Sequence, residues 1–98
     1  METEIEIKTN EYYQNLYEDL ALYKRYLKET EWEIKNFEDW LEGIEKGKEG
    51  EVYDKQYEQM VKDNLKRAKL VKAAIESQIS LITSILNEAK AEIEEQSN

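Results

Sequence analysis

Apolar residues recur at helical spacing over the first half of the chain, from about residue 11 to residue 45. They follow one another at intervals of three and four, which are the a and d positions of a coiled-coil-like seam. The pattern predicts one helix over residues 10–46, with Thr9 or Asn10 as its N-cap. The seam positions are Tyr13, Leu16, Leu20, Tyr23, Leu27, Thr30, Ile34, Phe37, Leu41 and Ile44.

A second run with the same spacing occupies the second half of the chain and predicts a helix over residues 51–95. The glycines between the two runs predict a turn at residues 47–50. Residues 1–9 alternate isoleucine with charged residues, so they form either a flexible arm or a short strand. The positions of the second seam are Tyr53, Tyr57, Val61, Leu65, Ala68, Val71, Ile75, Ile79, Ile82, Leu86, Ala89 and Ile93.

Two long helices joined by a short turn predict an all-α fold, in which residues 1–98 form a single domain. The predicted architecture is a long antiparallel, coiled-coil-like helical hairpin. With the turn near residue 47, residues that face each other across the hairpin have numbers that sum to about 95.

The second predicted helix carries another apolar row beside its seam, formed by Leu70, Ala74, Leu81 and Ile85. One partner helix covers only one row, so the second row needs another partner. We therefore expect these four residues to form an oligomer interface. The expected assembly is a four-helix bundle or a larger homo-oligomer.

Composition narrows the possible chemistry. The net charge is −9, which disfavours direct binding to nucleic acid or to anionic membranes. There is no cysteine and no histidine, so the usual nucleophile, general base and metal ligands are missing. We expect a non-catalytic protein without a cofactor or a metal. No long apolar run or signal peptide is visible, which favours a cytoplasmic location.

Several large aromatic residues lie outside the first seam, among acidic residues. Exposed aromatic side chains are typical of protein contact surfaces. They predict an acidic helical binding protein that blocks or scaffolds a partner with a basic surface. Small inhibitors or adaptors of phages and other mobile elements, which are viral accessory proteins, are of this type. The residues expected at the partner surface are Tyr12, Tyr17, Tyr26, Trp32, Trp40, Glu29, Glu33, Glu38 and Asp39.

A basic belt gives an alternative function. If facing residues sum to about 95, the segment 62–72 lies opposite residues 23–33, and cations of both helices meet there. Arginine and tyrosine together can bind phosphate and a base, so an oligomer could sequester a nucleotide-like small molecule. Ion pairs from Glu29, Glu31 and Glu33 to Lys62 and Lys66, which would set the register of the hairpin, are the other interpretation of this region. The belt consists of Tyr23, Lys24, Arg25, Tyr26, Lys28, Arg67, Lys69 and Lys72.

The segment Trp40-Leu41-Glu42-Gly43 lies near the middle of a chain of 98 residues that is expected to form a helical hairpin. In these features the chain resembles the WXG100 family of small secreted hairpin dimers of type VII secretion. The resemblance implies a secreted or structural assembly protein. Two features depart from the family: two residues, not one, separate Trp40 from Gly43, and no tyrosine follows Tyr57.

Overall fold

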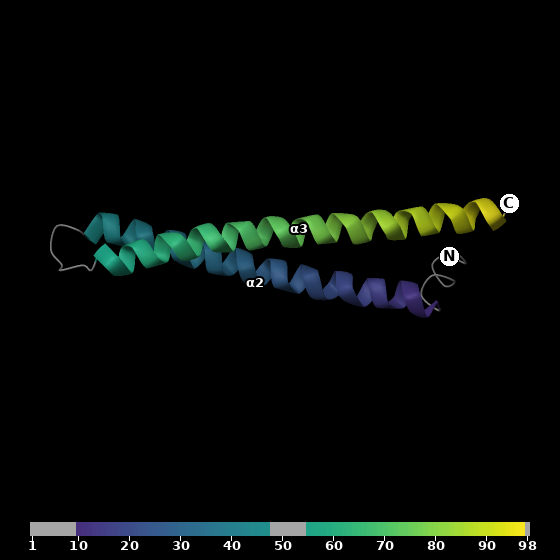
Figure 1. The fold of residues 1–98 in the computed structure, drawn as a ribbon, viewed down its shortest axis with the longest axis horizontal. Helices are drawn as coiled ribbons and strands as arrows, with labels where there is room; N and C mark the ends of the chain where they lie inside the picture. Colours follow the sequence, from purple (N-terminus) through teal and green to yellow (C-terminus); the bar gives the residue numbers. More distant parts are fainter. Residues whose placement is uncertain (1–9, 48–54, 98) are drawn as a thin grey trace. The chain divides into compact units, whose positions relative to one another are not determined.

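The computed structural model describes residues 10–47 and 55–97, and the side chains of 10–44 and 55–95. These residues form two α-helices, α2 (Glu11–Gly47) and α3 (Lys55–Ser97), as Figure 1 shows. The described part of the chain contains no strand. The predicted all-α helical hairpin is therefore confirmed.

The observed helix ends lie close to the predicted ones. The first helix was expected over residues 10–46 and spans Glu11–Gly47, and the second was expected to end at 95 and ends at Ser97. Differences of one or two residues are normal at helix ends. Three predictions lie outside the described residues: the arm at 1–9, the residues 48–50 of the turn, and the start of the second helix at 51–54, which includes Tyr53 of the second seam.

Asn10 caps the start of α2, one of the two caps that the sequence allowed. Its Oδ1 atom accepts a hydrogen bond from the backbone N–H of Tyr12 at 2.9 Å. Its carbonyl oxygen accepts the N–H of Gln14 at 2.8 Å, which is the first hydrogen bond of the helix. Glu11 places a negative charge at the positive end of the helix dipole.

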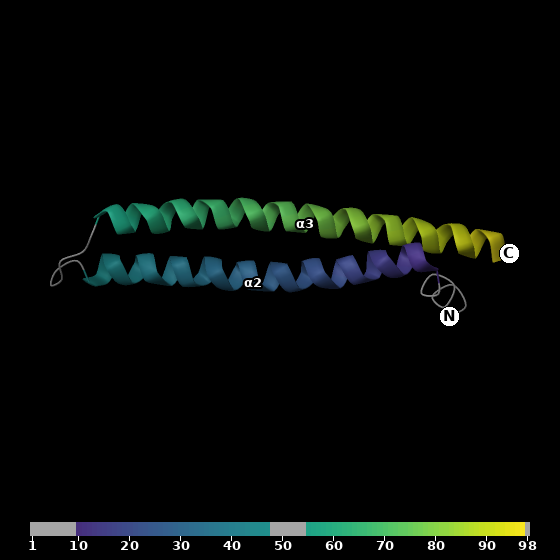
Figure 2. The ribbon, with the colours of Figure 1, turned by 60° about the horizontal axis from the view of Figure 1, so that its bottom comes forward.

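The contacts of the chain group into two units, which we describe separately. The terminal unit pairs the start of α2, up to Tyr26, with α3 from Ile75 onward. The central unit spans Leu27–Ala74 and holds the rest of both helices. In each unit one piece of α2 runs antiparallel to one piece of α3 (Figures 1 and 2).

The core of the terminal unit is built from the predicted seams. On α3, Ile82, Leu86 and Ala89 are buried at three- and four-residue spacing. A half-buried row of α2 side chains packs against them, together with Ile93 of α3. Apolar burial of this kind is the main favourable term in helix pairing. The α2 residues of this row are Tyr13, Leu16, Tyr17, Leu20 and Tyr23.

The core of the central unit is narrower. Thr30 and Ile34 of α2 and Val61 and Ala68 of α3 are buried. Near the end of α2 an edge-to-face pair adds to this core, since the ring centroids of Trp40 and Tyr57 lie 4.9 Å apart. In both units every predicted seam position of the first helix, from Tyr13 to Ile44, is buried or half-buried. The heptad assignment of this helix is therefore confirmed.

The register across the central unit differs from the predicted one. Thr30, Glu33 and Phe37 share a groove with Val71, Ala68 and Asn64, so facing residues sum to about 101 rather than 95. The midpoint between the described end of α2, Gly47, and the described start of α3, Lys55, is residue 51, whereas the glycines had placed the turn near 47. A later midpoint raises the sum of the residue numbers by the same amount for every facing pair.

Candidate interaction surfaces

Three of the five aromatic residues expected at a partner surface are exposed. The exposed fraction is 67% for Trp32, 60% for Tyr12 and 39% for Tyr26. Tyr12 and Tyr26 belong to the terminal unit and Trp32 to the central unit. Trp32 is exposed because its position lies away from the seam of α2, whose members Thr30 and Ile34 are buried.

The other two aromatic residues lie against the protein itself. Tyr17 is half-buried and packs on the α3 core of the terminal unit. Trp40 is half-buried and contacts Tyr57. Neither side chain offers the free surface that Trp32 does.

The segment around Trp32 is strongly acidic. Residues 29–39 contain five carboxylates and one lysine, Lys35. The four carboxylates that the sequence had placed at the partner surface are all exposed: Glu29, Glu33, Glu38 and Asp39. Trp32 therefore stands in a negative field at the middle of α2.

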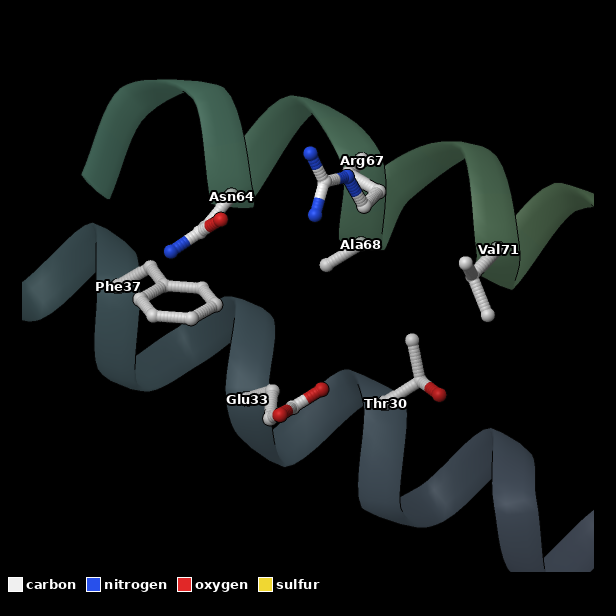
Figure 3. A pocket seen from close by; sticks show the side chains of 7 residues that line it. All are labelled: Thr30, Glu33, Phe37, Asn64, Arg67, Ala68 and Val71. Carbon is white, nitrogen blue, oxygen red and sulfur yellow. The ribbon is translucent and has the colours of Figure 1, made fainter. Parts of the chain in front are cut away.

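A groove runs between the helices of the central unit, with a volume of about 250 Å³. We call it the Val71 groove. Figure 3 shows the methyl group of Thr30 pointing toward Val71, while Glu33 and Arg67 rise from opposite helices. Its lining is Thr30, Glu33, Phe37, Asn64, Arg67, Ala68 and Val71.

A second groove of similar volume, about 300 Å³, lies on the other edge of the same helix pair. We call it the Lys72 groove. It is on the other edge because Glu33 precedes the buried Ile34 and Lys35 follows it, so the two flank the seam on opposite sides. Its lining is almost entirely charged and consists of Glu31, Ile34, Lys35, Glu38, Asp39 and Lys72.

The observed register changes the surroundings of the basic belt. With the predicted register, segment 62–72 would face Lys24, Arg25 and Lys28. In the structure Arg67 shares a groove with Glu33, and Lys72 shares one with Glu31, Glu38 and Asp39. Arg67 and Lys72 of α3 therefore lie mainly among acidic residues of α2, although Lys35 of α2 also lines the groove of Lys72.

The belt residues are also divided between the two units. Tyr23, Lys24, Arg25 and Tyr26 belong to the terminal unit. There the Tyr23 and Tyr26 rings meet edge to face at 6.5 Å, and the Arg25 guanidinium lies 5.7 Å from the centre of the Tyr26 ring. Lys28, Arg67, Lys69 and Lys72 belong to the central unit, where Arg67 and Lys72 line different grooves. Neither of these two grooves therefore holds both Arg67 and Lys72.

The four residues expected at an oligomer interface differ in exposure. Leu70 is 65% exposed and Leu81 is 54% exposed. Ala74 is exposed and Ile85 is half-buried. Leu70 and Ala74 belong to the central unit, and Leu81 and Ile85 to the terminal unit.

Sequence reasoning missed Val71 as a surface residue. The heptad spacing placed it in the seam of the second helix, but its side chain is 45% exposed. A single facing helix covers only part of an apolar stripe, and Val71 lies at the edge that α2 leaves open. Periodicity alone does not say which edge that is. Tyr57 is a second such residue, because the spacing placed it in the seam and its side chain is 48% exposed. The other large apolar side chains that are exposed and were not singled out are Leu22 and Met60.

No protein-family model, no curated protein and no solved structure matches this chain. The resemblance to the WXG100 family therefore gains no support. Neither helix has a described stretch long and apolar enough to cross a membrane. Among the residues that the structure describes, no three carboxylates are grouped as they would be around a metal ion.

Proposed function

We propose that this chain is a non-catalytic protein-binding module that docks through the Trp32 face of α2 on a partner with a basic surface. We define the Trp32 face as Trp32 with Glu29, which precedes it by three positions and therefore lies on the same side of α2. The observation that carries the proposal is the 67% exposure of Trp32. Tryptophan is among the residues that contribute most when they become buried in a protein interface.

Exposure of the Trp32 ring to water costs free energy. A tryptophan exposes a large apolar area to water, and covering it with a partner recovers the free energy of that burial. The position on α2 contributes nothing to the hairpin core, since Trp32 lies off the seam. Its size is therefore better explained by a contact outside the chain than by folding.

Charge identifies the kind of partner. The five carboxylates of residues 29–39 and the net charge of −9 repel acidic surfaces and attract basic ones. Such attraction raises the rate of association and weakens with added salt. We propose that the protein works in the cytoplasm as a small inhibitor or adaptor, and that it covers or positions the basic surface of its partner.

The alternative of a nucleotide-sequestering oligomer has no specific observation in its favour. It needs cations of both helices in one belt, and the described register places Arg67 and Lys72 among carboxylates of α2 instead. A phosphate would meet repulsion from those carboxylates. The protein-binding role needs no such rearrangement.

The test is a comparison of Trp32→Ala with Asn87→Ala in affinity purification from the cells that make the protein. Asn87 is exposed and lies on α3 in the terminal unit, so it is a control outside the Trp32 face. We expect the wild type and Asn87→Ala to retain the same partner, and Trp32→Ala to lose it. Far-ultraviolet circular dichroism should show equal helix content in all three chains.

The affinity for the isolated partner should fall roughly 30-fold or more with Trp32→Ala, as for the stronger contacts of protein interfaces. It should also fall with rising salt for the wild type. Retention of the partner by Trp32→Ala with unchanged affinity would remove the basis of this proposal.

A further inference from the structure

The Val71 groove is an opening in the core of the central unit. Val71 belongs to the same apolar stripe of α3 as Ala68, yet it is 45% exposed while Ala68 is 7% exposed. Phe37, Ala68 and the methyl group of Thr30 continue the apolar lining (Figure 3). A further helix is needed to cover this edge.

The two edges of the helix pair differ in charge. The Lys72 groove is lined by five charged side chains around Ile34 and is well solvated as it stands. The Val71 groove carries one carboxylate, Glu33, and one guanidinium, Arg67, which balance each other. The apolar side chains thus lie at the edge where local charge cancels.

The balance of charge in the Val71 groove indicates which molecule can cover it. A second copy of this chain brings another net charge of −9, so the two copies repel each other over most of their surfaces. They can approach only where the local charge cancels and apolar area is available. The Trp32 face fails this condition because acidic residues surround it, and the Val71 groove meets it.

We infer that a second copy of this chain packs on the Val71 groove about a two-fold axis. In such an interface the same residues serve both sides, so the surface must be complementary to itself. Arg67 of each copy meets Glu33 of the other copy, which gives two identical ion pairs. Val71 of both copies becomes covered between them. This interface is separate from the Trp32 face and does not depend on the proposed partner.

The geometry can be tested with two charge reversals that are matched to each other. In Glu33→Arg both groove positions are positive, and in Arg67→Glu both are negative. Each variant alone then sets two pairs of like charges against each other across the two-fold axis. We expect wild-type dimers in analytical ultracentrifugation, and a dissociation constant raised roughly tenfold or more for each variant alone.

Mixing the two variants separates an intermolecular pair from an intramolecular one. In a mixed dimer, positive groove residues of one copy face negative groove residues of the other at both pairs. The mixture should therefore associate with an affinity near that of the wild type. Lys35→Glu, in the Lys72 groove, is the control on the other edge and should leave association unchanged.

Three results would overturn the inference. Sedimentation of the wild-type chain as a single copy at every concentration would show that the dimer does not form. If the mixture of the two variants associates no better than either variant alone, the reciprocal ion pairs do not exist. If Lys35→Glu weakens association as much as Glu33→Arg does, the dimer interface is not at the Val71 groove. Circular dichroism of every variant should show wild-type helix content, because Glu33, Lys35 and Arg67 are exposed.

Discussion

In this hairpin, whether a residue is buried depends on whether its side chain lies on the seam or away from it. Thr30 and Ile34 lie on the seam and are buried, whereas Trp32, between them in sequence, is 67% exposed. The difference is purely one of rotation about the helix axis. Because only two helices share the core of each unit, a change of one position moves a side chain from burial to solvent.

Gly43 lowers the stability of α2, and neither its backbone angle nor a close neighbour requires a glycine at this position. It lies in the interior of α2 with a negative φ, and a Cβ atom added there would meet nothing within 4 Å. Glycine in a helix interior is less favourable than alanine because the unfolded chain gains more conformational freedom.

We predict that Gly43→Ala stabilises the folded chain by about 0.5–1 kcal/mol. Urea denaturation followed by circular dichroism measures the free energy of unfolding of both chains. Asn36→Ala, at an exposed position earlier in α2, is a suitable control for a general effect of alanine. A Gly43→Ala chain less stable than wild type would mean that this glycine has a close neighbour or a special backbone role.

At the scale of helices, periodicity predicted most of what the structure shows. The seam from Tyr13 to Ile44 was assigned correctly because a long heptad pattern fixes which face of a helix is buried. The Asn10 cap followed from residue type and position. The register was wrong because the glycines placed the centre of the turn near residue 47, whereas the midpoint between the described ends of α2 and α3 is residue 51.

The candidate surfaces were predicted less completely than the helices. Exposure of Trp32 follows from its position off the seam, but the burial of Tyr17 and the openness of Val71 do not. Both depend on how α2 and α3 are rotated toward each other. Short-range spacing within one helix contains no information about that rotation.

We predict that the described register can be trapped by a disulfide, since the natural chain has no cysteine. Thr30 and Val71 point toward each other in Figure 3. A chain with Thr30→Cys and Val71→Cys should therefore form an intramolecular disulfide under mild oxidation, seen as a shift in gel mobility that a reducing agent reverses.

The matched control is Thr30→Cys with Leu65→Cys, which face each other only if residue numbers sum to about 95. That chain should remain reduced under the same conditions. Rapid bonding of the Leu65 pair and none of the Val71 pair would restore the register predicted from the sequence.

For the whole molecule, net charge and exposed apolar surface act against each other. A charge of −9 keeps copies of the chain apart, while the side chains of Trp32, Leu70 and Val71 favour contact. We infer two kinds of contact from this balance. The acidic Trp32 face suits a basic partner, and the charge-balanced Val71 groove suits a second copy.

The most direct test of this account is native mass spectrometry of the wild-type chain purified from the cells that make it. Copy number and retained molecules are read from the same spectrum. The account predicts a species with two copies of the chain and the added mass of a bound protein. A bare single copy at all protein concentrations would contradict it, because neither surface would then be an interface. Two copies with a few hundred daltons of added mass would instead support the nucleotide-sequestering alternative.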